Sequence, residues 1–218
     1  MEKELRINDN CQYNLETRAD GKRYLTFYSI VFNKLSRDMG GWRERILPIA
    51  VEGADFSEWC VKKNHDANLL LAASWSGTAT HTIDAKGVLT SALVGDSTIW
   101  NDTIKEVERG DLACASFEFQ NASDGVEWTR ELNEAGTEIE VRNIKRFYKI
   151  WDQSPVVVPA YPDTKGITVA NREFEQIVNQ RAIDDEKPKT EEQETPPPAA
   201  EVQPWEVEIE LLELESVV

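Results

Sequence analysis

The order of apolar and polar residues predicts a chain built mainly of β-strands. Residues 12–17 and 23–32 are short stretches rich in aromatic and aliphatic side chains, and Asp20-Gly21 between them is a dipeptide typical of a hairpin turn. Apolar side chains occur on both alternating faces of the second stretch. A strand with two apolar faces suits the wall of a β-barrel.

A buried strand is predicted at residues 110–119, and it has a serine near its middle. The run is apolar, ends in alternating aromatic residues and begins at a Gly-Asp turn signal. Because neighbours on a strand point to opposite faces, Ser116 lies opposite Phe117 and Phe119 and shares its face with Cys114. By its local pattern alone, such a serine is an ordinary hydrogen-bonded hydroxyl.

Shorter patterns predict the remaining elements. Strands are expected at residues 69–73, 78–84, 88–94, 126–132 and 138–150. Helices are expected at residues 53–60, at 97–109 with Asp96 or Ser97 as the cap and Gly110 as the stop, and at 171–181.

The 218 residues are enough for one well-buried domain followed by a tail. We assign residues 1–170 to the domain and residues 171–183 to a C-terminal helix. Residues 184–204 are rich in Glu, Lys, Thr and Pro, which predicts a disordered linker. Residues 205–218 alternate acidic and apolar side chains, a pattern that suits a strand up to Leu211 and a short helix after it. This terminal peptide is either a docking tag or a frayed end.

Charge and cysteine content exclude several classes of protein. The net charge is −16; the twelve Asp or Glu and two Lys from Asp184 onward give −10 of it, which leaves −6 for residues 1–183. The sequence has no basic cluster, so binding to nucleic acid or to an anionic membrane is not expected. Three cysteines cannot all pair, no apolar segment follows a basic N-terminus, and no run reaches the roughly 18 apolar residues of a membrane span. These features indicate a reducing cytoplasm.

Three separated motifs carry a resemblance to a known family. They are Asn-His-Asp at residues 64–66, a helix ending in Arg-Gly-Asp that leads into Ser-Phe-x-Phe at residues 116–119, and Ser-Pro-Val-x-x-Pro-Ala-Tyr-Pro at residues 154–162. Together they resemble the prohead (capsid maturation) proteases of tailed phages, a family distantly similar to the herpesvirus assemblin serine proteases. The resemblance covers about residues 23–163. It implies an α+β fold, with a small, mainly antiparallel β-barrel surrounded by helices and a disordered acidic C-terminal tail.

The resemblance assigns a nucleophile and a base. A serine hydroxyl needs an adjacent base to take its proton as it attacks a carbonyl, and a neutral imidazole suits that task. Ser116 is the expected nucleophile. The chain has two histidines, His65 and His81, and its position in the family pattern selects His65.

The third member of the site is expected to be a carboxylate. The herpesvirus relatives have a histidine after the serine, but this chain has none beyond His81, and the phage branch has a carboxylate there. Asp152 stands at the matching position, with Glu138 and Glu140 as alternatives. Backbone N–H donors for the oxyanion are expected between residues 158 and 161, where Ala160 and Tyr161 are the candidates because proline has no N–H.

Other chemistries have less support in the sequence. It has no Gly-x-Ser-x-Gly elbow, no Walker loop and no Gly-x-Gly-x-x-Gly motif, and His65, Asp66 and His81 lack the spacing of a metal site. We therefore expect no cofactor and no metal. Cys114 shares the face of Ser116 and is an alternative nucleophile, although a cysteine in an apolar strand is more often a packed core residue. Cys114-Ala115 also replaces a glycine that the relatives tend to have beside the serine.

The resemblance implies a serine endopeptidase of capsid maturation. It would trim the scaffolding segment of the major capsid protein, and itself, inside the assembling procapsid in the host cytoplasm. The major capsid protein is the expected partner, with the portal and a second copy of the chain as further candidates. The alternatives are a non-catalytic assembly or scaffold module that retains the protease fold, and a general esterase or peptidase.

Overall fold

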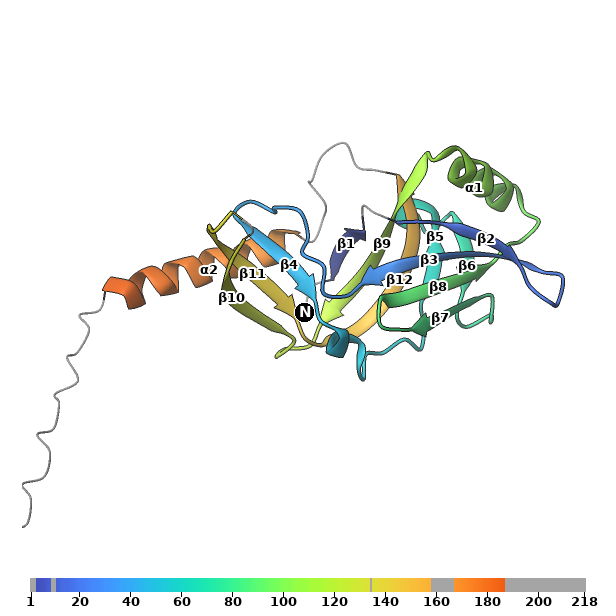
Figure 1. The fold of residues 1–218 in the computed structure, drawn as a ribbon. Helices are drawn as coiled ribbons and strands as arrows, with labels where there is room; N and C mark the ends of the chain where they lie inside the picture. The colour runs from blue at the N-terminus through green and yellow to red at the C-terminus, as the bar shows by residue number, and fades with distance from the viewer. Residues whose placement is uncertain (1–2, 9–10, 134, 158–166, 187–218) are drawn as a thin grey trace, which may run out of the picture. The chain divides into compact units, whose positions relative to one another are not determined.

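The computed structural model describes residues 3–8, 11–133, 135–157 and 167–186 of the chain. These residues form a mainly β, α+β fold with three sheets and two α-helices (Figure 1). In chain order the elements are β1 (Glu4–Asn8), β2 (Asn14–Thr17), β3 (Arg23–Val31), β4 (Trp42–Ile46), η1 (Pro48–Val51), β5 (Cys60–Lys62), η2 (Lys63–His65), β6 (Leu70–Ala73), β7 (Ala79–Ile83), β8 (Gly87–Leu93), α1 (Thr98–Arg109), β9 (Leu112–Asn121), β10 (Val126–Leu132), β11 (Glu138–Ile144), β12 (Phe147–Val157) and α2 (Ile167–Glu186), where η1 and η2 are 3₁₀ turns. The chain has two compact units, residues 1–181 and residues 182–218.

The largest sheet has five strands in the order β1-β9-β12-β5-β6. β9, the strand predicted around Ser116, pairs antiparallel with β1 on one side and with β12 on the other. β12 pairs in parallel with the short strand β5. The serine strand is therefore confirmed, and it lies in the interior of the sheet.

The two predicted hairpins are confirmed in a four-stranded sheet of order β2-β3-β8-β7. Gly21 in the first turn has a φ of 76°, a left-handed conformation that glycine adopts without strain. In the second turn, the Asp84 carboxylate accepts the N–H groups of Lys86 and Gly87 at 2.8 and 3.0 Å. A third sheet, β10-β11-β4, combines one antiparallel and one parallel pair.

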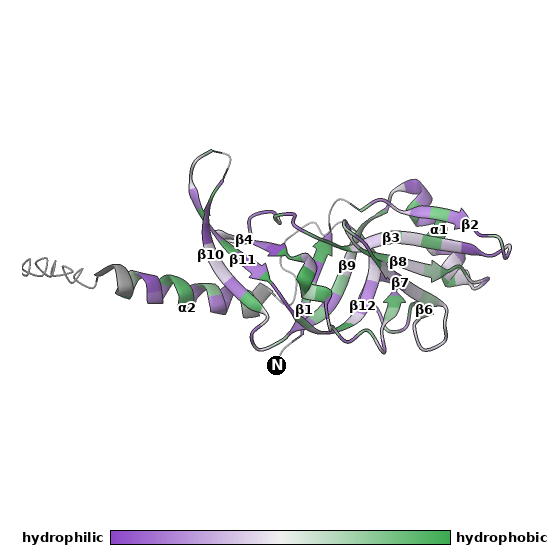
Figure 2. Cartoon of the chain, turned by 60° about the horizontal axis from the view of Figure 1, so that its bottom comes forward, coloured by the Kyte–Doolittle hydropathy of each residue, from purple (hydrophilic) through white to green (hydrophobic). Residues whose placement is uncertain are grey.

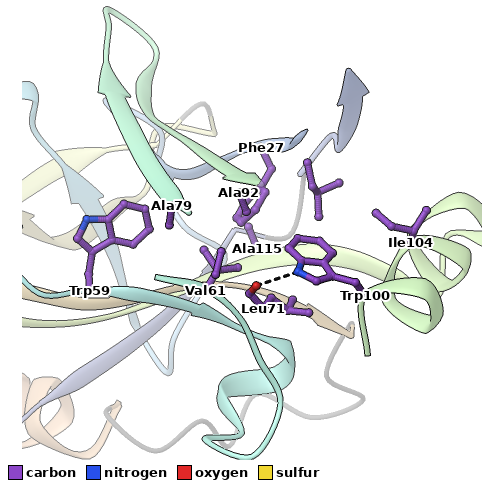
Figure 3. Packing of buried hydrophobic residues seen from close by; sticks show 11 residues of the cluster. Phe27, Trp59, Val61, Leu71, Ala79, Ala92, Trp100, Ile104 and Ala115 are labelled. Carbon is purple, nitrogen blue, oxygen red and sulfur yellow. Dashed lines mark hydrogen bonds between the residues drawn. The ribbon is translucent and has the colours of Figure 1, made fainter. Parts of the chain in front are cut away.

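Two clusters of buried apolar side chains join these sheets. The first lies between the five-stranded sheet, the four-stranded sheet and α1 (Figure 3), and in it the indole of Trp100 donates to the backbone carbonyl of Leu71 at 2.8 Å. The second joins all three sheets and contains Phe117, Phe119 and Phe147, whose rings pack with centroids 4.9 to 6.0 Å apart. The aromatic face of β9 therefore forms part of the core.

The two predicted helices after residue 96 are confirmed. Ser97 caps α1 by accepting the Trp100 N–H at 3.4 Å, and Gly110 ends the helix with a left-handed φ of 82°. α2 extends beyond both predicted ends. Hydrophobic and hydrophilic residues are interspersed along it (Figure 2), and its Phe174 stacks on Trp128 of β10 at 5.8 Å. No helix in the described part of the chain combines the length and apolar character that a membrane crossing requires.

The closed barrel and its surrounding helices are not observed in the residues that the structure describes. The five-stranded sheet ends at β1 and β6, the four-stranded sheet ends at β2 and β7, and neither closes on itself. The two sheets instead pack against each other through the first apolar cluster. The coarser α+β prediction, with mainly antiparallel strands, agrees with the structure. Residues 184–186 of the predicted tail continue α2. The rest of the predicted tail lies outside the described residues.

Two local predictions were wrong, and three strands were missed. Residues 53–60 are not a helix, because the backbone of Asp55 bonds instead to Tyr148 and Ile150 of β12. Residues 138–150 are not one strand, because the chain leaves β11 and enters β12 at a turn in which two N–H groups donate to the carbonyl of Gly125. The strands β1, β4 and β5 were not predicted.

Five charged side chains form a connected network in the interior, which we name the buried ion network: Glu4 and Arg6 of β1, Glu44 of β4, Arg142 of β11 and Glu173 of α2. Arg6 makes a two-point contact with Glu44 at 2.6 and 2.8 Å. Arg142 donates to Glu4 and Glu44 at 2.7 to 3.0 Å and to Glu173 at 2.9 Å. Burial disfavours the charge of Arg142, but the surrounding carboxylates outweigh this effect and raise its pKa. The network connects β1 and α2, the first and last described elements, with β4 and β11.

Replacing Arg142 tests how much this network stabilises the fold. Arg142→Met leaves the carboxylates of Glu4 and Glu44 short of a partner in the interior, so we expect the free energy of unfolding to fall by about 3–5 kcal/mol. Arg130→Met removes a half-exposed ion pair to Glu140 and should cost less than about 1 kcal/mol. Urea unfolding monitored by circular dichroism measures both variants. Equal losses in the two would contradict a special role for the buried network.

Candidate active site

The pairing of β9 with β12 determines where Ser116 lies. In this antiparallel pair, Ser116 is directly opposite Ser154, and Glu118 is directly opposite Asp152. Directly opposite residues of an antiparallel pair have their side chains on the same face. Ser116, Ser154 and Asp152 therefore share one face of the five-stranded sheet, and the aromatic core lies on the other.

The Ser116 hydroxyl is engaged with the neighbouring strand. Ser116 is 0% exposed, and its Oγ donates to the backbone carbonyl of Arg6 in β1 at 2.8 Å. β1 lies on the opposite side of β9 from β12. The hydroxyl thus points towards β1 in this structure, and a polypeptide substrate reaches it only if the surrounding chain opens.

Asp152 is a buried carboxylate with three side-chain partners. Its Oδ1 accepts a hydrogen bond from Ser154, which in turn accepts the backbone N–H of Lys62 at 2.9 Å. Its Oδ2 lies 2.6 Å from Nζ of Lys62 and 3.2 Å from Nδ1 of His65. The structure therefore brings His65 and Asp152 into contact, although they are 87 positions apart in the chain.

His65 reaches this position through an unusual backbone turn. It ends η2, in which Asn64 and His65 both have left-handed φ values, of 52° and 58°. Asparagine and histidine are among the residues that tolerate this region best. The Asn64 side chain also accepts the N–H of Val157 at 3.0 Å, which ties the turn to the end of β12. The loop of His65 is thus attached to the strand that carries Asp152.

The imidazole of His65 lies beside Asp152 without an aligned hydrogen bond. Its side chain is 19% exposed, and neither ring nitrogen has a geometrically aligned hydrogen-bond partner among the described residues. Nδ1 is the ring nitrogen on the side of Asp152 and is within ion-pair distance of its carboxylate. Among the described residues, no hydrogen bond joins Ser116 and His65.

The alternative residues lie elsewhere. His81 is on β7, where it stacks on Phe56 at 4.3 Å, and its burial lowers the pKa of the imidazole. Glu138 and Glu140 are on β11 in the three-stranded sheet, and Glu140 is paired with Arg130 and Arg181. These residues lie on strands outside the sheet that carries Ser116.

Two residues of the site were not singled out from the sequence, Lys62 and Ser154. Strand alternation could have found Ser154, which stands two positions after Asp152 and therefore on the same face. Nothing in the sequence marks Lys62. Burial disfavours its ammonium charge, but its ion pair with Asp152 outweighs this and raises its pKa. On the same strand, burial and the charge of Asp152 raise the pKa of the Cys60 thiol to about 11.

The remaining candidates are the alternative nucleophile, the oxyanion donors and a metal site. Cys114, the alternative nucleophile, is fully buried on β9. Ala160 and Tyr161, the candidate oxyanion donors, lie outside the described residues. Within the part of the chain that the structure describes, no group of three or more His, Cys, Asp or Glu side chains is arranged to hold a metal ion.

A histidine in contact with a buried carboxylate, on the sheet face that also carries a strand serine, is the residue set of a serine hydrolase. A scan against protein-family models matched residues 12–180 to the Caudovirus prohead serine protease family. The chain belongs to this family of phage capsid-maturation proteases. No curated protein and no solved structure matched the chain.

Asn64 offers a test of how the histidine turn is held. Asn64→Ala loses both the bond to Val157 and the tolerance for a left-handed backbone, so we expect peptide hydrolysis to slow by about ten- to a hundredfold as His65 shifts. Asn64→Asp keeps an acceptor oxygen and the backbone tolerance and should stay within a few-fold of the parent chain. Initial rates of substrate cleavage measure both. If Asn64→Ala cleaves at the parent rate, the turn does not depend on this side chain.

Proposed function

We propose that this protein is the serine endopeptidase that cleaves the scaffolding segment of the major capsid protein, and its own chain, during capsid maturation. It would act inside the assembling procapsid in the host cytoplasm, with the major capsid protein as its substrate. The proposal rests on membership of the prohead protease family. The observation that supports it best is the contact of His65 with Asp152, on the sheet face that also holds Ser116.

Each residue has a role in the proposed reaction. Ser116 Oγ attacks the scissile carbonyl, and His65 takes its proton through Nε2 and passes it to the leaving amine. Asp152, against Nδ1, orients the imidazole and stabilises its protonated form. The Ser116 hydroxyl must first leave the Arg6 carbonyl.

The second candidate function is a non-catalytic assembly module with the protease fold. The observation that favours it is the state of the serine, which is fully buried and bonded to β1 with no hydrogen bond to His65. A scaffold of this kind would alter capsid assembly without changing the mass of the capsid protein. The same experiment therefore separates the two functions.

Co-expression with the cognate major capsid protein tests the proposal. The parent chain should shorten the capsid protein, and Ser116→Ala or His65→Ala should reduce its cleavage by about 10⁴-fold or more, to below detection. His81→Gln, which changes the other histidine, should cleave normally. Intact-mass spectrometry of the capsid protein provides the readout. A capsid protein of unchanged mass with the parent chain would favour the assembly module.

Self-cleavage is tested on the purified protein alone. The acidic segment after α2 is the expected region of cleavage, because its Glu-, Thr- and Pro-rich sequence is of the kind that proteases cleave most readily. We expect the parent chain to lose mass from its C-terminal end and Ser116→Ala to keep its full length. If mass spectrometry finds identical full-length chains in both preparations, self-processing is excluded.

A further inference from the structure

Lys62 and Ser154 form a clamp around the Asp152 carboxylate. Ser154 donates to Oδ1 of Asp152 and accepts the main-chain N–H of Lys62 at 2.9 Å. The side chain of Lys62 returns to the same carboxylate, with Nζ 2.6 Å from Oδ2. Lys62 thus contributes to the clamp twice. Its backbone N–H contacts Ser154, and its ammonium group contacts Asp152. Both Asp152 and Ser154 are 0% exposed, so water does not screen these contacts.

Lys62 and His65 share one oxygen atom. Nδ1 of His65 lies 3.2 Å from Oδ2, the atom that Lys62 contacts. In the usual arrangement a carboxylate stabilises the protonated imidazole. Here the ammonium cancels much of the negative charge of Asp152, and it also lies close enough to repel a second positive charge on His65.

The other titratable groups around the pair are uncharged, paired or exposed to solvent. On β5, Cys60 lies opposite Asp152 and has a pKa of about 11, so it is uncharged at neutral pH. On β9, Glu118 lies opposite Asp152 and pairs with Lys3 at 3.4 Å. In η2, Lys63 pairs with Glu106 of α1 at 2.6 Å, and Asp66, the residue after His65, is exposed. The ammonium of Lys62 is therefore the charge in direct contact with the carboxylate.

We propose that Lys62 is a positioning residue that fixes the Asp152 carboxylate together with Ser154, and that its ammonium, on the same Oδ2 as His65, limits the negative charge that Asp152 presents to the imidazole. This inference rests on the proposed function, because His65 must be free of a proton to act as a base. The ammonium sets the charge beside the imidazole, and Ser154 sets the orientation of the carboxylate. The two residues therefore have separable effects on catalysis.

Removing the positive charge of Lys62 should shift the pH dependence of kcat/KM. With Lys62→Met, the full negative charge of Asp152 faces His65, so the acid limb of the kcat/KM profile should move to higher pH by about one unit or more. Lys62→Arg keeps the charge and should leave the limb near its original position. Lys63→Met is the matched control, since it removes the adjacent lysine that pairs with Glu106 instead. Its acid limb should not move.

Removing the Ser154 hydroxyl should lower kcat without shifting the acid limb of the pH profile. Ser154→Ala frees one oxygen of the carboxylate, so we expect kcat to fall by about tenfold with the acid limb unchanged, and Ser154→Thr to restore the rate. An acid limb that moves as far in Ser154→Ala as in Lys62→Met would contradict the division of roles. A rate that Ser154→Thr does not restore would contradict the role of the hydroxyl.

A titration that needs no activity separates this inference from the proposed function. In a Ser116→Ala background, the carbon-bound protons of the two imidazoles are followed by NMR as pH changes, with His81 as the internal reference. Adding Lys62→Met should raise the titration midpoint of His65 by about one unit, and adding Lys63→Met should not. Lys62→Gln gives the same readout should Lys62→Met fail to fold.

The two hypotheses then fail differently. A parent chain that does not cleave capsid protein, with a midpoint that moves as expected, overturns the protease but leaves the role of Lys62 intact. A parent chain that cleaves, with a midpoint unaltered by loss of the Lys62 charge, overturns the role of Lys62 alone.

Discussion

The register between β9 and β12 is the constraint on which the candidate site depends. It sets Ser116 opposite Ser154 and places both on the face of Asp152. A slip of one residue would move Ser116 to the other face, since side chains alternate along a strand. The slip is prevented by the apolar clusters, because Phe117 and Phe119 would leave the core with it. Packing on one face of the sheet thus maintains the chemistry on the other.

The buried ion network brings a second constraint to the same residues. Charges in the interior are tolerated when each is paired, and they then specify one arrangement of the elements that carry them. Arg6 contributes its side chain to the network and its backbone carbonyl to the Ser116 hydroxyl. The conformation of the serine is therefore connected to β4, β11 and α2 through one residue of β1. Opening of the site for a polypeptide involves this strand.

The sequence predicted the parts of the fold that depend on local patterns. Hairpin dipeptides, the cap at Ser97 and the stop at Gly110 all lie where their chemistry indicated. β1 was missed because its alternate residues are the charged Glu4 and Arg6, buried only through partners far along the chain. For the same reason Lys62 was not recognised, since its pairing with Asp152 exists only after the strands assemble. The contact of His65 with Asp152 was predictable from the family resemblance and from no local pattern.

The long separations within the ion network also constrain the order of events during synthesis. Glu4 and Arg142 are 138 residues apart, so the first strand cannot complete its charge pairing until most of the domain has left the ribosome. β9 and β12 are likewise incomplete until then, because β12 follows Arg142. A nascent chain that ends before β12 therefore lacks the pairing that places Asp152 and Ser154 on the face of Ser116. The candidate site is therefore incomplete until the chain has been made through β12.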